Sequence, residues 1–90
     1  MYHHEIFKKT GTEVQREDNC ILVQGVQGKV LLNVSAGIVW DYIDGFSDAD
    51  CIADNIKRLY GEENSEEHIL AVVEEAIDEL LRNNLIERMG

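Results

Sequence analysis

The chain has 90 residues, of which 44% are hydrophobic and 29% charged, and its formal net charge at pH 7 is −10. This composition predicts one folded domain over residues 1–90 and excludes a disordered chain. No apolar run approaches the roughly 20 residues that cross a bilayer, and the first residues lack the apolar core of a signal peptide, so we expect a cytoplasmic protein.

The charge is concentrated in the second part of the chain. Residues 1–34 carry four acidic and four basic side chains, whereas the remaining residues carry fourteen acidic and four basic ones. An acidic surface repels nucleic acid and anionic membranes, so we expect neither as a partner. Partners with basic or neutral surfaces are favoured instead.

The N-terminal half predicts an antiparallel sheet of three strands. The polar segment Thr12–Glu17 is typical of an edge strand, and Cys20–Gln24 is rich in residues that favour strands. Lys29–Asn33 is the returning strand, and the GVQG segment at 25–28 indicates a hairpin between the last two strands. Residues 6–7 either begin a further strand or pack as an arm.

Three helices are predicted after the sheet. The first follows the last strand almost directly, and Gly45 is its expected left-handed stop. Ser47 is the predicted N-cap of the second helix, and Gly61 is its predicted end. Ser65 is the predicted N-cap of the third helix, and Asn84 is a left-handed terminator before the chain returns to the core.

The third helix has more apolar surface than one packing face requires. At about 100° per residue, its apolar side chains span roughly 180°, against about 100° for an ordinary surface helix. Two uses of the extra width are open: a second contact inside the domain, or a groove beside the helix that holds side chains of a partner. The apolar side chains are Ile69, Leu70, Val72, Val73, Ala76, Ile77, Leu80 and Leu81.

Residues suited to catalysis or metal binding do not form a recognisable pattern. The three histidines have no partner at ligand or triad spacing. Five aspartates between residues 41 and 54 suggest calcium, but counting from Asp48 the glycine position of an EF-hand loop falls on Ala53. Cys20 and Cys51 form no C-x-x-C pair and are expected to be free thiols in apolar positions. We therefore expect no enzyme activity, metal or cofactor.

Three strands with three helices are also compatible with a winged helix-turn-helix that binds DNA. The third helix would then be the recognition helix, but its polar face carries five acidic side chains, and Arg82 is the only basic residue within it. Because lysine and arginine supply most non-specific affinity for phosphate, such a helix is repelled by the duplex.

A strand at the edge of the sheet suits a binding module better. Its N–H and C=O groups are available to an extended peptide, unless the N-terminal arm of the chain covers them.

The residues around the predicted junction of strand and helix resemble a known family. From Val30 to Ser47 the chain reads V-L-L-N-x-x-A-x-x-x-W-D-x-x-D-G-F-S, which is similar to the PqqD family of peptide chaperones. These proteins are also called recognition elements for RiPPs, the ribosomally synthesised and modified peptides. Ile52–Gly61 and Ala76–Ile86 continue the similarity, which covers about residues 12–88. Asn84 departs from the family pattern, in which glycine is usual.

The resemblance implies a winged-helix-like α+β fold with a three-stranded antiparallel sheet followed by three helices. It also implies a non-catalytic module that binds the leader segment of a precursor peptide as an added strand. The module presents this leader to a modifying enzyme, such as a radical SAM protein or a leader peptidase. A winged-helix adaptor between proteins, without a peptide client, is the alternative. Carried over to this chain, the expected peptide-binding residues are Lys29, Val30, Leu31, Leu32, Asn33, Leu70, Val73, Glu74, Ile77 and Leu81.

Overall fold

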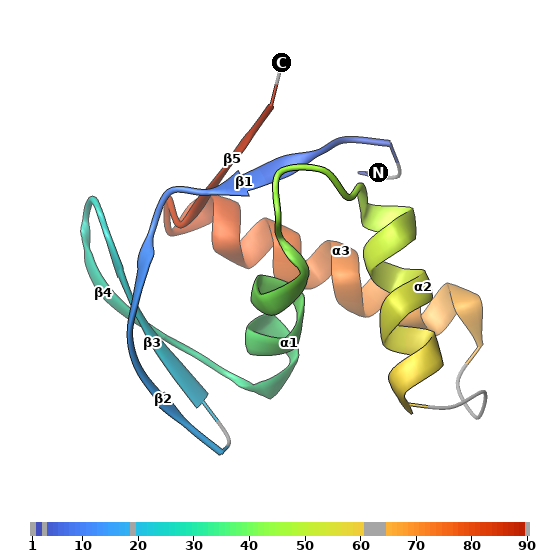
Figure 1. Cartoon of the computed structure of the whole chain (residues 1–90), viewed down its shortest axis with the longest axis horizontal. Coiled ribbons are helices and arrows are strands. Elements are labelled where there is room, and N and C mark those ends of the chain that lie inside the picture. Colours follow the sequence, from blue (N-terminus) through green and yellow to red (C-terminus); the bar gives the residue numbers. More distant parts are fainter. Residues whose placement is uncertain (1, 3, 19, 61–64, 90) are drawn as a thin grey trace.

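The computed structural model describes residues 2, 4–18, 20–60 and 65–89 and shows an α+β fold (Figure 1). Its main sheet has three antiparallel strands in the order β2 (Thr12–Glu17), β3 (Cys20–Gly25) and β4 (Gly28–Leu32). Cys20 therefore begins the central strand, and β2 is exposed along its whole length, as its polar sequence predicts. The predicted fold class and strand order are confirmed.

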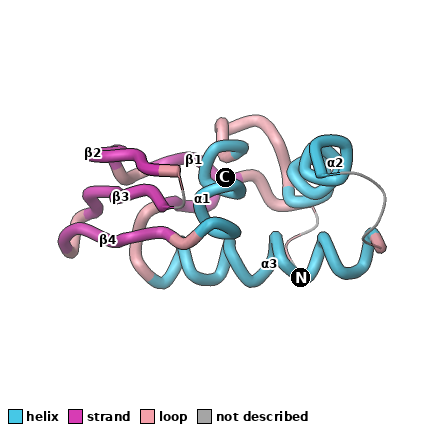
Figure 2. Tube along the Cα trace, turned by 90° about the horizontal axis from the view of Figure 1, so that it is seen from below, coloured by secondary structure: helices cyan, strands magenta, loops and turns pink. Residues whose placement is uncertain are grey.

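Three helices follow the sheet: α1 (Val34–Tyr42), α2 (Ala49–Tyr60) and α3 (Glu66–Arg82). Seen from below, the sheet lies at one end of the molecule and α2 at the other, while α3 runs along the length of the domain (Figure 2). α3 packs against both α1 and α2. No helix in the described ranges combines the length and apolar character needed to cross a bilayer.

Side chains near the helix starts accept hydrogen bonds from backbone N–H groups that have no partner inside the helix. The Asn33 side chain accepts from the N–H of Ala36 at 2.9 Å. Ser65 caps α3, as predicted. The prediction that Ser47 caps α2 is wrong, because the carboxylate of Asp48 accepts from the N–H of Cys51 at 2.9 Å. The two residues are adjacent and both suit an N-cap, but Ser47 donates hydrogen bonds to Asp44 in the preceding turn.

Left-handed residues stand where the sequence predicts them. Asn84 has a φ of 56° directly after α3, and Gly45 has a φ of 85° between α1 and α2. Asparagine tolerates this conformation better than most residues, so Asn84 can stand where glycine is more common. Gly61, the predicted end of the second helix, lies outside the described residues.

A second, two-stranded sheet was not predicted as such. β1 (Phe7–Lys9) pairs antiparallel with β5 (Ile86–Arg88), and the N–H of Gly11 donates to the carbonyl of Leu85 at 3.0 Å. Of the two alternatives for the N-terminal segment, the strand is correct. The pairing joins the two ends of the chain, so it depends on contacts that local sequence patterns do not report.

The core lies between the sheet, α1 and α3. Trp40 of α1 is 2% exposed and is one of the largest fully buried side chains. Most of the apolar side chains of α3 are buried inside the domain. This favours the first alternative for its wide apolar face, a second contact inside the domain, over a groove for a partner. The buried residues of α3 are Ile69, Val73, Ala76, Ile77 and Leu80.

Candidate functional site

The strand β4 forms an open edge of the main sheet. Within the described residues it pairs with β3 alone, and the hairpin closes at Gly25 opposite Gly28. In a two-residue hairpin the closing pair is hydrogen-bonded, and hydrogen-bonded and non-bonded pairs then alternate. Lys29 and Leu31 therefore direct their N–H and C=O groups toward the free edge.

The N-terminal arm lies elsewhere in the molecule. The ring of Tyr2 packs edge-on against Phe7 at 5.8 Å, and its hydroxyl donates a hydrogen bond to Asp78 of α3. This hydrogen bond and burial raise the pKa of Tyr2. Since the described part of the arm pairs with β5, it leaves the edge of β4 uncovered.

Successive side chains of β4 lie on opposite faces of the sheet. Leu32 is fully buried and Val30 is half-buried against the core, whereas Leu31 is 63% exposed on the outer face. Leu31 stands directly opposite Leu22 of β3, so these two side chains form an apolar pair across the strands. A shallow hollow of about 180 Å³ on this outer face is lined by Gln15, Glu17, Cys20, Leu22 and Leu31.

α3 runs beside the open edge. A Cβ atom built on Gly25, at the hairpin tip, would lie 3.4 Å from the backbone oxygen of Asn83. The tip of the hairpin therefore meets the C-terminal end of α3. In Figure 2 the main sheet lies at the end of the molecule where α3 ends. A hollow of about 140 Å³ lies where β4 ends, and its lining residues are Asn33, Ser35, Ala36, Val72, Glu75, Ala76 and Glu79.

The strand residues of the predicted site are all at this edge, but the predicted α3 residues are not. Val73 and Ile77 have no exposed surface and belong to the core. Leu70 lines a different hollow, between α2 and α3, and Leu81 packs against the core. Half-buried Glu74 lies on the same flank of the helix as these two leucines. This geometry argues against a groove formed by those α3 residues, and their role in peptide binding stays a prediction.

The helix residues beside β4 lie on the other flank of α3. Val72, Ala76 and Glu79 lie roughly 120–180° around the helix from Leu70 and Leu81. Helical periodicity identifies both flanks of the apolar face, but only the packing of the arm and of α1 shows which flank faces the sheet. Glu75 and Glu79 give this flank two acidic side chains next to the open edge.

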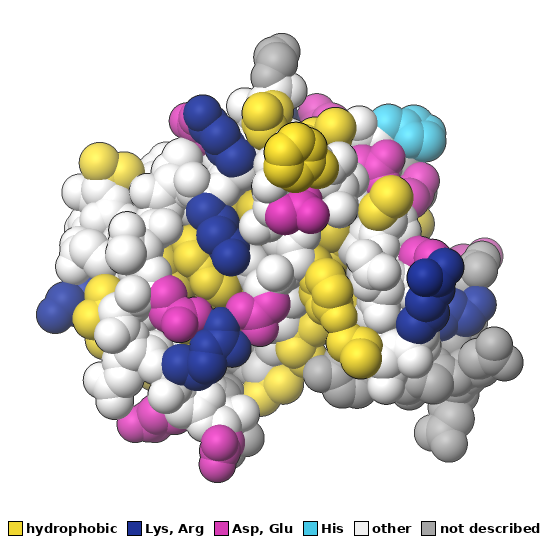
Figure 3. Space-filling view, in the orientation of Figure 1, with side chains coloured by type: hydrophobic (Ala, Val, Ile, Leu, Met, Phe, Trp, Pro, Cys, Tyr) yellow, Lys and Arg dark blue, Asp and Glu magenta, His cyan; other side chains and the backbone are white. Residues whose placement is uncertain are grey.

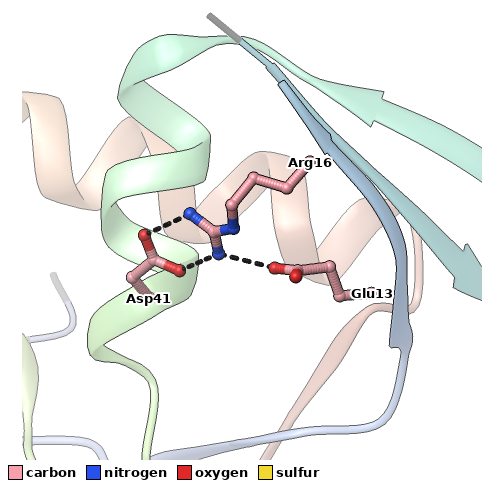
Figure 4. A network of polar contacts seen from close by, with 3 residues as sticks. All are labelled: Glu13, Arg16 and Asp41. Carbon is pink, nitrogen blue, oxygen red and sulfur yellow. Dashed lines mark hydrogen bonds and ion pairs between the residues drawn. The ribbon is translucent and has the colours of Figure 1, made fainter. Parts of the chain in front are cut away.

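An ion-pair network holds the sheet against α1. Arg16 of β2 donates hydrogen bonds to both carboxylate oxygens of Asp41 in α1, at 2.6 and 3.1 Å, and to Glu13 at 2.5 Å (Figure 4). These bonds raise the pKa of Arg16. On the face seen in Figure 3, Lys and Arg side chains alternate with acidic ones. The three side chains are 39–48% exposed, so the network is a surface link between β2 and α1.

The cysteines and other potential ligands add no further site within the described residues. Cys20 and Cys51 are free thiols, as predicted, but the expected apolar position of Cys51 is wrong because its side chain is exposed on α2. A hydrogen bond to Asp48 raises the pKa of the Cys51 thiol. Across the described part of the chain, no three His, Cys, Asp or Glu side chains are placed to hold a metal ion.

The fold and this edge define a small α+β module whose open strand lies beside a helix. A model of the PqqD family, described as coenzyme PQQ synthesis protein D, matches residues 19–86, and the chain belongs to this family. The resemblance predicted from the sequence is thereby confirmed. The family consists of accessory, peptide-binding proteins of PQQ and RiPP biosynthesis. Comparisons with curated proteins and with solved structures found no match.

Proposed function

We propose that this protein binds the leader segment of a ribosomally synthesised precursor peptide as an additional strand along β4. The observation that carries the proposal is the open edge of β4 beside α3, in a member of a peptide-binding family. Lys29 and Leu31 supply the backbone groups that pair with the leader. Half-buried Val72 supplies an apolar surface near the end of the strand.

The bound leader is then presented to a modifying enzyme, such as a radical SAM protein or a leader peptidase. The protein itself performs no chemical step in this proposal. Its contribution is to hold an otherwise flexible peptide in one extended conformation. The enzyme then pays a smaller conformational-entropy cost when it binds the precursor. The precursor therefore reaches the enzyme with its leader already ordered.

The decisive experiment removes one backbone donor from the edge. Leu31→Pro deletes the N–H of residue 31 and so removes one hydrogen bond to the leader. Leu31→Thr loses the same leucine side chain but keeps the N–H, so it is the matched control. We expect Leu31→Pro to weaken binding about tenfold or more and Leu31→Thr about threefold, which corresponds to one net hydrogen bond of difference.

Binding is measured by titrating the full chain with a synthetic leader of the precursor peptide encoded beside its gene. Circular dichroism verifies that both variants are folded. Equal affinities of the two folded variants would contradict strand addition. A parallel titration with duplex DNA at low salt is expected to show no binding, because of the acidic face of α3.

Presentation is tested separately with the modifying enzyme encoded in the same neighbourhood. The rate of leader-dependent modification is measured with no added protein, with the wild-type chain and with Leu31→Pro. We expect stimulation by the wild-type chain alone. If the wild-type chain and Leu31→Pro stimulate modification equally, presentation does not depend on the edge of β4, and this part of the proposal is refuted.

A further inference from the structure

We infer that the edge of β4 selects peptides that carry an apolar residue and a lysine or arginine an odd number of positions apart. The inference rests on the proposed strand addition and adds the chemistry of the peptide that is selected. It follows from two different surfaces, one on each side of the same strand edge.

The outer side of the edge carries an apolar pair. Leu31 is 63% exposed and stands opposite the half-buried Leu22 of β3. The polar side chains that line the hollow beside this pair, Gln15 and Glu17, belong to β2 and lie two strands away from the open edge. A side chain placed opposite Leu31 by an added strand would lengthen the row to three apolar residues. Cross-strand neighbours of this kind stabilise sheets, and an exposed leucine gains from being covered. This side therefore favours an apolar residue.

The inner side of the edge is apolar at its base and acidic at its rim. Val72 and Ala76 line the hollow near the end of β4, and Glu75 and Glu79 line it as well. Lysine and arginine suit such a surface because their methylene stems pack on apolar groups while their charged ends reach outward to carboxylates. The formal charge of −10 adds a long-range attraction for a basic peptide. This side therefore favours lysine or arginine.

The odd spacing is a consequence of strand geometry. Successive side chains of a strand point to opposite faces, so two residues that use opposite faces are separated by one, three or five positions. A peptide with the same two residue types at an even spacing places both on one face. It then loses either the contact with Leu31 or the contact with Glu75 and Glu79.

The inference is tested with a displayed library of random 12-residue peptides selected on the full chain. We expect enriched peptides to share an apolar residue and a lysine or arginine at an odd spacing. One enriched peptide is then synthesised with its basic residue moved by one position. We expect the shifted peptide to bind about tenfold more weakly, because it loses one of the two side-chain contacts.

Matched charge variants test the inner side. Glu79→Gln and Glu67→Gln each remove one negative charge from α3, but only Glu79 lies in the hollow beside β4. We expect Glu79→Gln to weaken binding of the enriched peptide about threefold, and Glu67→Gln to leave it nearly unchanged. Leu31→Thr is expected to abolish the preference for the apolar residue while the preference for the basic residue persists.

The outcomes separate the two proposals. If enriched peptides lose affinity on Leu31→Pro but show no preference for odd spacing, or if both glutamate variants behave alike, the inferred specificity is refuted and strand addition stands. If neither the library nor the leader yields a peptide whose binding depends on the N–H of residue 31, strand addition itself fails. Odd spacing together with selective loss on Glu79→Gln supports both.

Discussion

Replacing Ile77 by alanine tests whether the apolar face of α3 is core or groove. The family resemblance implies that Ile77 is a peptide-binding residue, whereas the structure leaves it with 0% exposed surface. A groove residue changes affinity when it is truncated, and a core residue changes the free energy of unfolding. The substitution therefore distinguishes the two assignments with one side chain.

The expected cost is large for a chain of this length. Truncation of a fully buried isoleucine to alanine costs about 2–5 kcal/mol, because transfer energy is lost and a cavity remains. A domain of 90 residues has a total stability of roughly 5–13 kcal/mol. A loss of about 3 kcal/mol would lower Tm by roughly 12–24 °C in a domain of this size.

Urea denaturation followed by circular dichroism measures the free energy of unfolding, and Val72→Ala is the control. Val72 is on the same helix but only half-buried, so its truncation is expected to cost about 1 kcal/mol or less. Leader affinity is measured at a temperature where both variants are folded. There we expect Val72→Ala to weaken binding more than Ile77→Ala does.

The opposite pattern would refute the reasoning from burial. If Ile77→Ala costs less than about 1 kcal/mol of stability while it weakens leader binding tenfold, the isoleucine lines the groove, as the family resemblance implies. The site would then move back to the flank of α3 that carries Leu70 and Leu81.

Three further predictions concern stability. Asn33→Ala removes the N-cap of α1 and is expected to cost about 1 kcal/mol in thermal unfolding, whereas Asn33→Asp keeps the acceptor and most of the stability. Gly11→Ala places a Cβ atom 2.8 Å from a methyl group of Val23 and 3.1 Å from the backbone oxygen of Gln24. This overpacking is expected to lower the free energy of unfolding by about 1–3 kcal/mol, measured by urea denaturation. An unchanged free energy of unfolding would contradict the close packing at Gly11. The backbone N–H groups of Phe46 and Ser47 donate to the Asp44 carboxylate and lower its pKa. The ionised carboxylate therefore stabilises the fold above about pH 4, and this stabilisation is lost as the pH falls through the lowered pKa. In urea denaturation between pH 5 and pH 2.5, Asp44→Asn is expected to lose less stability than the wild-type chain.

Local patterns of the sequence were sufficient for most elements of the fold. The three strands of the main sheet and the three helices follow from hydrophobic periodicity and from turn residues such as Gly45 and Asn84. Ser65 was identified as a cap because it directly precedes a helical pattern. These features depend on neighbours within a few residues, which is the range that a sequence pattern reports.

The α2 cap shows the limit of local signals. Ser47 and Asp48 are both suitable caps, and their difference is one residue of helix register. The hydrogen bonds of the preceding turn decide between them. The N–H and the hydroxyl of Ser47 both donate to the carboxylate of Asp44, at 2.8 and 3.2 Å, so Ser47 belongs to that turn and Asp48 caps the helix.

Local sequence signals were enough to predict the strands of the main sheet, the three helices and their order, and the resemblance identified the family. The pairing of β1 with β5 and the position of Val72 and Glu79 near Asn33, just after β4, follow from the packed structure alone. The physical reason is that secondary structure depends on residues close in the chain, whereas the orientation of a helix depends on everything packed around it. Here Tyr2 of the N-terminal arm donates a hydrogen bond to Asp78 of α3, a contact between residues far apart in the chain.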